Sequence, residues 1–529
     1  MKRALGDIRL FASAAGLRLR AYQTPAAQAI VQSVLQRQGL TFVVMFPRQS
    51  GKNELQAQIE AYLLALLCQG RAEIVKVAPT WRPQGQNALR RLERVLRRNP
   101  FTRGHWQREG ASIVRLLQAR VYFLSGAPGS NVVGATASAL LACDEAQDVL
   151  PDKWDREFAP MAASANATRV FWGTAWTAQT LLARERRAAE WAERQDGIRR
   201  VFVLGAEEVG RQVPAYAAYV ANEVRRLGRL HPFIRTQYFS EEIDGEGGLF
   251  PPARRAQMRG THPPHAGPLA GRLYAFLLDV AGAAETPLEG GWGEPGAPGG
   301  AESAPAAGAG GRDATALTIV EVGLDSLSDP ARQAPTYLVA ARRLWEGTSH
   351  PRLYAELQGL VGEWGPRVLV VDATGVGAGL AGFLQAAFPA QTRPFVFSQA
   401  SKSKLGWDFL ALVETGRFLD HAPARPPRAG ETPEACLLAQ FDASGRPAWQ
   451  TLFWRQVIAC RHTAHPGPER SLRWGVPEGT RDPQSGKRVH DDLLVSAALC
   501  ATLDHEHWGL AHSQVLGPPD PLAGMGETF

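Results

Sequence analysis

The segment FPRQSGKNEL, residues 46–55, matches most of the loop sequence that holds nucleotide phosphates in ATPases. The usual form of that loop is G-x-x-x-x-G-K-[ST]. Gly51 and Lys52 fit it. However, Phe46 stands where the first glycine belongs, and Asn53 stands where the hydroxyl residue belongs. The segment is therefore either a working nucleotide site or a chance Gly-Lys pair, and its neighbours must decide.

The flanking residues have the pattern that a phosphate loop needs. The β-rich run TFVVMF predicts a strand before the loop, and NELQAQIEAYLLALLCQG predicts a helix that ends at Gly70. Strand, loop and helix in this order let backbone N–H groups surround phosphates at the helix start. Lys52 would meet the outer phosphates, Arg48 adds a second cation, and the amide oxygen of Asn53 could hold Mg²⁺ directly or through water.

A second motif, SALLACDEAQDV, carries an apolar run into Asp144 and Glu145. A buried strand that ends in two carboxylates can place one acid on Mg²⁺ and the next beside the attacking water. Alone, such a pair is more often a solvated strand end. Together with the Gly-Lys loop upstream, it predicts an ATPase. Gly173 and Thr174 end the run RVFWGT, where they are interpreted as a γ-phosphate sensor, with a plain turn as the alternative.

The second half of the chain contains acids in similar settings. Asp279 ends YAFLLD, Asp372 ends VLVVD, and Asp491 and Asp492 open a predicted helix. Strand ends that face a helix start can bring distant carboxylates together, and a divalent ion then offsets their repulsion. Two-metal cleavage of phosphodiesters uses such a cluster, and oxygen ligands favour Mg²⁺ or Mn²⁺. The alternative is ordinary turn and helix-cap chemistry of aspartate.

Length and composition indicate that the chain forms more than one domain. The 529 residues exceed what one hydrophobic core supports. Alternating predicted strands and helices in the first half indicate an α/β fold with a largely parallel sheet. We predict an ATPase domain, a Gly/Pro-rich linker, a second domain with a flexible insertion, and a C-terminal tail, at residues 1–245, 246–268, 269–505 (insertion 283–312) and 506–529.

Charge and cysteine usage indicate the kind of binding partner and the cellular compartment. The net charge is +7, the pI is near 9.3, and arginine supplies most of the positive charge, which favours a polyanionic partner unless genome composition explains it. The five cysteines form no C-x-x-C pair, which favours a reducing compartment. No run of about eighteen apolar residues occurs, so an intracellular protein without a membrane span is expected.

The motifs together resemble those of a known family. PRQSGKN, LLACDEAQD and WGTA, followed by LLDVAG, VVDATGVG and HDDLLVSAA, are similar to motifs of the large terminase subunit of tailed double-stranded DNA bacteriophages. The resemblance spans residues 20 to 505 or so. It implies a P-loop ATPase domain of the ASCE, RecA-like class, joined to an RNase H-like nuclease domain. Such a protein packages viral DNA into a procapsid and cuts concatemeric DNA.

The resemblance also implies roles for individual residues. The residues that it implies for ATP binding are Gln23, on the adenine side, and Arg48, Gln49, Ser50, Gly51, Lys52, Asn53, Asp144 and Thr174. The catalytic residues are Glu145, which polarises water in the ATPase, and Asp279, Asp372 and Asp492 in the nuclease. The metal ligands are Asn53, Asp144, Asp279, Asp372, Asp491 and Asp492, with Asp492 preferred over Asp491 because it lies nearest the helix body.

Cofactors and partners follow from the same resemblance. They are ATP with Mg²⁺, two Mg²⁺ or Mn²⁺ ions at the nuclease, double-stranded DNA, the portal protein, the small terminase subunit and a pentameric ring of copies. The expected location is the host cytoplasm, docked on the procapsid. One departure stands out: family members often carry Arg-Gly before the second acidic strand, whereas Val133 precedes Gly134 here. In the family this arginine is proposed as an arginine finger that reaches a neighbouring subunit. Here either another arginine supplies that finger, or ATP hydrolysis is organised differently.

Two other functions remain open at this point. A helicase-nuclease or another DNA repair ATPase also suits DEAQ, and it would need a second RecA-like domain. A nucleic-acid-binding or capsid-docking protein with a decayed ATP fold is the second alternative. Intact Lys52, Asp144 and Glu145 speak against decay.

Overall fold

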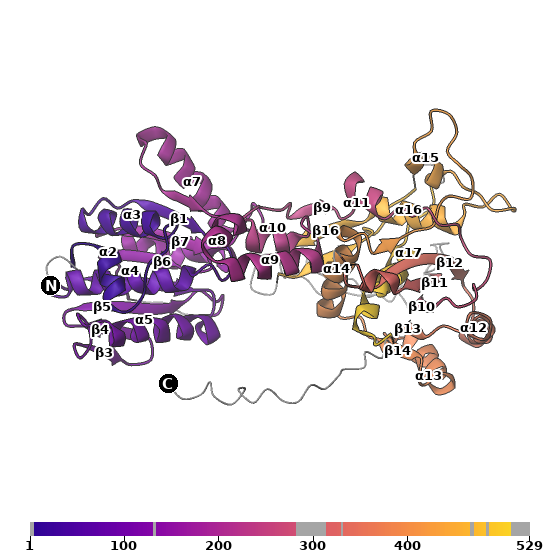
Figure 1. Ribbon diagram of the computed structural model, residues 1–529, viewed down its shortest axis with the longest axis horizontal. Coiled ribbons are helices and arrows are strands. Elements are labelled where there is room, and N and C mark those ends of the chain that lie inside the picture. Colours follow the sequence, from indigo (N-terminus) through magenta and orange to yellow (C-terminus); the bar gives the residue numbers. More distant parts are fainter. Residues whose placement is uncertain are drawn as a thin grey trace, which may run out of the picture.

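The computed structural model describes residues 5–130, 134–281, 314–329, 332–465, 470–482 and 486–508. The predicted insertion at 283–312, Val133 and most of the predicted tail lie outside the described residues. The elements form two halves along the longest axis of the molecule, each built around its own sheet, with α9 (Pro214–Leu227) and α10 (Pro232–Tyr238) between them (Figure 1).

The N-terminal half contains an eight-stranded sheet with the order β3-β4-β5-β2-β6-β7-β1-β8. Six neighbouring strands, from β5 to β8 in this order, are parallel, and β3, β4 and β5 pair antiparallel at one edge. The predicted α/β class is therefore confirmed, with a mixed sheet. The strands are β1 (Thr41–Met45), β2 (Glu73–Ala78), β3 (Trp106–Glu109), β4 (Ile113–Leu116), β5 (Ala119–Ser125), β6 (Leu140–Cys143), β7 (Thr168–Gly173) and β8 (Val201–Val203).

Helices cover both faces of this sheet, so its central strands are apolar on both sides. Along β1, Phe42 and Val44 join one hydrophobic cluster, whereas Val43 and Met45 join the cluster on the opposite face, as strand alternation requires. The helices of this half are α2 (Ile8–Ala14), α3 (Thr24–Leu35), α4 (Lys52–Leu67), α5 (Gln86–Arg98), α6 (Pro151–Lys153), α7 (Leu181–Asp196) and α8 (Ala206–Gln212), followed by α9 and α10.

The C-terminal half contains a six-stranded sheet with the order β14-β13-β10-β11-β12-β15. Strands β10, β11 and β12 pair antiparallel, whereas β13 runs parallel to both β10 and β14. The carboxyl ends of β10 and β13 therefore meet at one edge of the sheet. The strands are β10 (Tyr274–Asp279), β11 (Ala314–Gly323), β12 (Thr336–Glu346), β13 (Val368–Asp372), β14 (Thr392–Phe395) and β15 (Phe418–Leu419).

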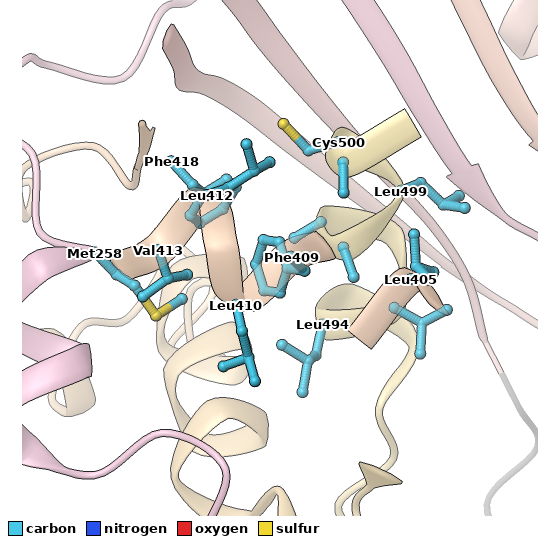
Figure 2. Close-up of a cluster of buried hydrophobic side chains, with 14 of the residues drawn as sticks. Met258, Leu405, Phe409, Leu410, Leu412, Val413, Phe418, Leu494, Leu499 and Cys500 are labelled. Atoms are coloured by element: carbon cyan, nitrogen blue, oxygen red, sulfur yellow. The ribbon is translucent and has the colours of Figure 1, made fainter. Parts of the chain in front are cut away.

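The two faces of this second sheet pack against different helices. Side chains of α14, α16 and α17 fill the larger core, part of which is seen in Figure 2, and α12 and α13 cover the other face. The helices are α11 (Pro252–Gln257), α12 (His350–Trp364), α13 (Gly377–Ala387), α14 (Gln399–Glu414), α15 (Pro433–Leu438), α16 (Trp449–Ala459) and α17 (Asp492–Ala498), which continues as a 3₁₀ helix through Leu499–His505.

A small third sheet joins the two halves. Its order is β17-β16-β9, where β9 is Glu246–Gly248, β16 is Arg461–Ala464 and β17 is Leu472–Gly475. Residues 246–268, predicted as a linker, thus contain a strand and the helix α11. The chain that leaves the N-terminal half enters the sheet of the C-terminal hairpin directly.

Aromatic side chains also pack between the halves. The ring centroids of Phe233 and Trp407 lie 4.8 Å apart, and Trp176 stacks on Phe233 at 6.1 Å. Buried His231 is the N-cap of α10, and its Nδ1 accepts a hydrogen bond from the Phe233 N–H at 3.2 Å. Its Nε2 lies 3.1 Å from the Trp407 carbonyl oxygen, so a neutral ring protonated at Nε2 satisfies both partners.

The stability of this junction should depend on pH. Burial lowers the pKa of His231 from 6.5 to about 4. The unfolded chain therefore binds more protons than the folded protein, and the free energy of unfolding falls as pH drops through this window, by about 3 kcal/mol in all. We expect His231→Gln to flatten this slope in denaturant titrations between pH 7 and pH 5 or so. Exposed His105 supplies the control variant His105→Gln, and equal slopes for both variants would contradict the prediction.

The thiols of all five cysteines are free in the structure. Cys68 is half-buried and the other four are buried, so no disulfide constrains the chain. Among the helices of the described ranges, none combines the length and apolar character needed to cross a membrane.

Candidate nucleotide and metal sites

The loop between β1 and α4 has the backbone of a tight turn into a helix. Gly51 is the N-cap of α4 with φ of 88°, in the left-handed region that favours glycine. A Cβ added to Gly51 would lie 2.8 Å from Nε2 of Gln23, so the Gln23 side chain would have to shift. Phe46 is fully buried in the core and meets Tyr22 edge-on at 5.9 Å between ring centroids. Phe46 thus fixes the start of the loop by packing.

An N-terminal segment holds this loop from one side. Tyr22 donates its hydroxyl to the Ser50 carbonyl oxygen at 2.7 Å, and Nη1 of Arg20 donates to the same oxygen at 3.2 Å. Gln23 is buried, and its Nε2 donates to the Gly51 carbonyl oxygen at 3.2 Å. The structure therefore places Gln23, the predicted adenine-side residue, against the loop backbone. Arg20 and Tyr22 were not predicted from the sequence.

Lys52, Asp144 and Glu145 come together from two separate strand ends. Nζ of buried Lys52 donates to Oε1 of Glu145 at 2.8 Å. Asp144 is also buried, and its Oδ1 accepts from Nε2 of Gln56 at 2.9 Å and from the Glu145 N–H at 3.1 Å. Strand β7 lies between β1 and β6, so the acids stand one strand away from the loop strand.

The ion pair with Lys52 sets the charge of Glu145. Burial alone would raise the pKa of this carboxyl, but Lys52, and then the amide of Gln147, hold the pKa below its usual value. Glu145 is therefore ionised at neutral pH, which is the state that a base or a water-orienting residue requires.

The other predicted loop residues are placed differently. Arg48, Gln49 and Asn53 are exposed. Ser50 is buried, and its Oγ donates to the Pro47 carbonyl oxygen at 2.7 Å, which stabilises the turn. The structure thus brings Lys52 to the acidic pair but leaves the exposed loop side chains facing solvent.

Gln147 links the acidic pair to the end of β7, a role that the sequence did not reveal. Its Nε2 donates to Oε2 of Glu145 at 2.8 Å and to Oδ2 of Asp148 at 3.1 Å. Its Oε1 accepts from the Thr174 N–H at 3.1 Å. Gln147 lies two residues after Glu145 in DEAQD, and that position was the one signal available. Thr174, predicted as a sensor, is therefore connected to Glu145 through one amide.

Gly173 has no space for a larger side chain, which gives a test of this link. A Cβ at Gly173 would overlap Oε1 of Gln147 and lie 2.6 Å from Cδ2 of Leu182. We expect Gly173→Ala to displace Gln147 and to lower kcat for ATP hydrolysis by roughly 10-fold. Steady-state turnover checks this against Gly129→Ala, where an added Cβ meets nothing within 4 Å. Equal turnover in both variants would remove Gln147 from the mechanism.

Three of the predicted nuclease acids lie within electrostatic reach of the fourth, Asp279. Burial raises the pKa of Asp279 well above its usual value, and Asp492, Asp372 and Asp491 add to this in decreasing order. The charge of Lys402, near the start of α14, acts in the opposite direction. The sequence did not single out Lys402. Asp279 ends β10, Asp372 ends β13, and Asp491 and Asp492 stand at the start of α17.

Backbone N–H groups hold two of these acids in place. Oδ1 of Asp372 accepts from the Thr374 N–H at 2.8 Å, and Oδ2 of Asp492 accepts from the Ala314 N–H at 3.3 Å. Asp491 is the N-cap of α17 without a side-chain capping bond, contrary to the capping alternative. Within the described ranges, no three acidic, histidine or cysteine side chains already surround one ion position. The donor set of carboxylate oxygens nevertheless fits a hard divalent cation, which would relieve the repulsion at Asp279.

Comparisons with known proteins give structural likeness alone. No protein-family model matches the chain, and no curated protein sequence matches it. Among solved structures, the HK97 bacteriophage large terminase is 12% identical, with 94% of this chain and 98% of that chain covered and a TM-score of 0.38. The large terminase of a thermophilic bacteriophage is 9% identical, with coverages of 90% and 98% and a TM-score of 0.42.

A third similar structure covers about half of this chain. The large terminase nuclease of the thermophilic phage G20c, with bound magnesium, is 15% identical over 48% of this chain and 96% of that chain, with a TM-score of 0.28. At these identities the likeness concerns the fold.

Proposed function

We propose that this chain hydrolyses ATP to move double-stranded DNA and also cuts DNA, as a packaging-motor subunit of the large terminase type. The observation that carries the proposal is the pairing of two sites in one chain. One half joins Lys52, Glu145 and Thr174 through short hydrogen bonds. In the other half, the charges of three further aspartates and of Lys402 act on Asp279, and these acids stand at the ends of β10 and β13 and at the start of α17.

In the ATPase half, the ion pair of Lys52 with Glu145 is the arrangement before ATP binds. ATP phosphates compete for Lys52, which then leaves the carboxylate free to orient water. Asp144, with Asn53 beside the loop, would hold Mg²⁺, which neutralises phosphate charge when bound. Loss of the γ-phosphate would reach Thr174 through Gln147, because the Gln147 side chain donates to the Glu145 carboxylate and accepts from the Thr174 N–H.

In the other half, Asp279, Asp372, Asp491 and Asp492 would hold Mg²⁺ or Mn²⁺, and two such ions activate water and stabilise the leaving oxygen when bound. Lys402 supplies positive charge beside the acids. It attracts a DNA phosphate to a region that is otherwise strongly acidic.

DNA binding follows from the basic character of the chain. Helix α5 alone exposes four arginines, namely Arg90, Arg94, Arg97 and Arg98. Contacts of arginine with backbone phosphates carry little sequence information and weaken steeply with salt. Docking on a portal in the host cytoplasm, a small-subunit partner and a pentameric ring belong to the proposal through the sequence resemblance.

The fold favours this proposal over a helicase. The second sheet opens with the antiparallel strands β10, β11 and β12. A second RecA-like domain would instead repeat the parallel sheet of the first half. The intact pair of Lys52 and Glu145 also argues against a decayed nucleotide site.

Digestion of supercoiled plasmid with Mg²⁺ or Mn²⁺ tests the proposal. We expect Asp372→Ala to stop cleavage and keep ATP hydrolysis, and Lys52→Ala to stop ATP hydrolysis and keep cleavage. This result would establish two separable sites. If the intact protein and Lys52→Ala both fail to cut with either metal, the second half is not a nuclease, and the helicase or docking function gains ground.

A further inference from the structure

Arg470 reaches the candidate nucleotide site from the C-terminal half of the chain. It stands just before β17, and its Nη2 donates to Oγ1 of Thr174 at 3.2 Å across a sequence separation of 296 residues. The guanidinium carbon also lies 4.9 Å from the ring centroid of Trp176. One side chain of the second half thus contacts the predicted sensor of the first.

The backbone around Arg470 is fixed on the same surface. The indole Nε1 of Trp407 donates to the Arg470 carbonyl oxygen at 3.1 Å. Just after β16, the His465 carbonyl oxygen accepts from Nε1 of Trp176 at 3.3 Å. Trp176 follows Thr174 by two residues, so the anchor and the target of Arg470 belong to one segment. Arg470 is therefore held in position and does not simply extend from the surface.

The charge of Arg470 faces the acidic end of the site. Burial lowers the pKa of Arg470, and the charges of Asp148 and Glu145 oppose that shift. In turn, burial raises the pKa of Asp148 to about 6, and Arg470 opposes this shift. The guanidinium is thus within electrostatic reach of the residue assigned to orient water.

A continuous chain of hydrogen bonds runs from Arg470 to the phosphate loop. Arg470 donates to Thr174 at 3.2 Å, and the N–H of Thr174 donates to Gln147 at 3.1 Å. Gln147 donates to Glu145 at 2.8 Å, and Lys52 donates to the other oxygen of Glu145 at 2.8 Å. Thr174 is buried, so the link between the two halves is shielded from solvent.

We propose that Arg470 is a positioning residue for ATP hydrolysis, supplied by the C-terminal half of the same chain and acting through Thr174 and Gln147 on Glu145. This inference rests on the proposed ATPase function. It makes the nucleotide site complete only while the hairpin is docked, so the two activities of the chain are mechanically linked at one side chain.

Basal ATP turnover of the full chain without DNA tests this role. We expect Arg470→Ala to lower kcat by about 10-fold or more, with KM for ATP changed less than about 2-fold. Arg470→Met keeps an apolar stem over Trp176, guards against misfolding, and should be as slow as Arg470→Ala. Exposed Arg473 lies on the adjoining strand, and Arg473→Ala is the matched control with turnover near that of the intact protein.

A double substitution separates positioning from general damage. Thr174→Val removes the acceptor of Arg470, so we expect the double variant Arg470→Ala with Thr174→Val to be no slower than the slower single variant. Multiplied losses, or an Arg470→Met variant as fast as the intact protein, would overturn the inference. Absence of turnover in the intact protein would overturn the ATPase function itself. Normal turnover in Arg470→Ala would overturn this inference alone.

Discussion

Glu145→Gln is expected to abolish most ATP turnover while ATP still binds. Loss of a positioned base costs about 10²–10⁴-fold in rate, so kcat should fall by at least about 100-fold. In the structure Lys52 is occupied by the Glu145 carboxylate at 2.8 Å. Glutamine carries no charge to hold Lys52, so the lysine is freed for phosphate and ATP affinity should stay equal or rise.

Two measurements check this pair of effects: steady-state phosphate release, and ATP affinity by equilibrium titration. Glu207 is exposed in the first turn of α8, and Glu207→Gln removes the same charge away from the site. This control should retain the turnover of the intact protein. Unchanged turnover in Glu145→Gln would show that another residue orients the water, and weaker ATP binding would contradict the competition for Lys52.

Asp279→Asn is expected to remove DNA cleavage and, with chelator present, to stabilise the fold. Burial and three neighbouring carboxylates raise the pKa of Asp279 well above its usual value, so its ionised form is unfavourable in the folded protein. The folded state therefore binds more protons than the unfolded chain, and stability is lost as pH rises above the usual aspartate range. Asparagine removes this cost, whereas it also removes a ligand charge that two-ion chemistry needs.

Plasmid cleavage should fall by about 100-fold or more, while the thermal midpoint at neutral pH in chelator rises by roughly 2 °C or more. The gain should shrink in acid, where Asp279 is protonated in the unfolded chain as well as in the folded protein and its burial no longer costs stability. Exposed Asp325 in the same half gives the control Asp325→Asn, for which neither change is expected. A stable variant that still cuts at the normal rate would exclude Asp279 from the reaction. Loss of cleavage with a lower midpoint would instead indicate structural damage.

The sequence predicted the parts of the molecule in which local pattern and chemistry agree. The strand TFVVMF became β1, the helix after the loop became α4, and the acids at the ends of YAFLLD and VLVVD stand on neighbouring strands. Each of these features is a buried apolar run ending at a polar residue, so a short stretch carries enough information to place it.

What the sequence did not predict depends on contacts between distant segments. In the edge hairpin, β3 buries none of its four residues and β4 alternates half-buried and buried residues over only four positions, too few to give a clear pattern. Gln147, Lys402 and Arg470 matter because of what packs against them. Arg470 meets Thr174 across 296 residues, and no local motif marks such a partner. The contact exists only where the two halves meet.

Strand β9 has a mechanical consequence for a protein proposed to pull on DNA. Its three residues, Glu246 to Gly248, pair antiparallel with β16 in the hairpin that leads toward Arg470. Tension between the halves would therefore load backbone hydrogen bonds of this small sheet before it stretched the segment that follows. Force between the halves would therefore pass through the paired strands β9 and β16. A pull strong enough to break this pairing would also disturb the hairpin that carries Arg470.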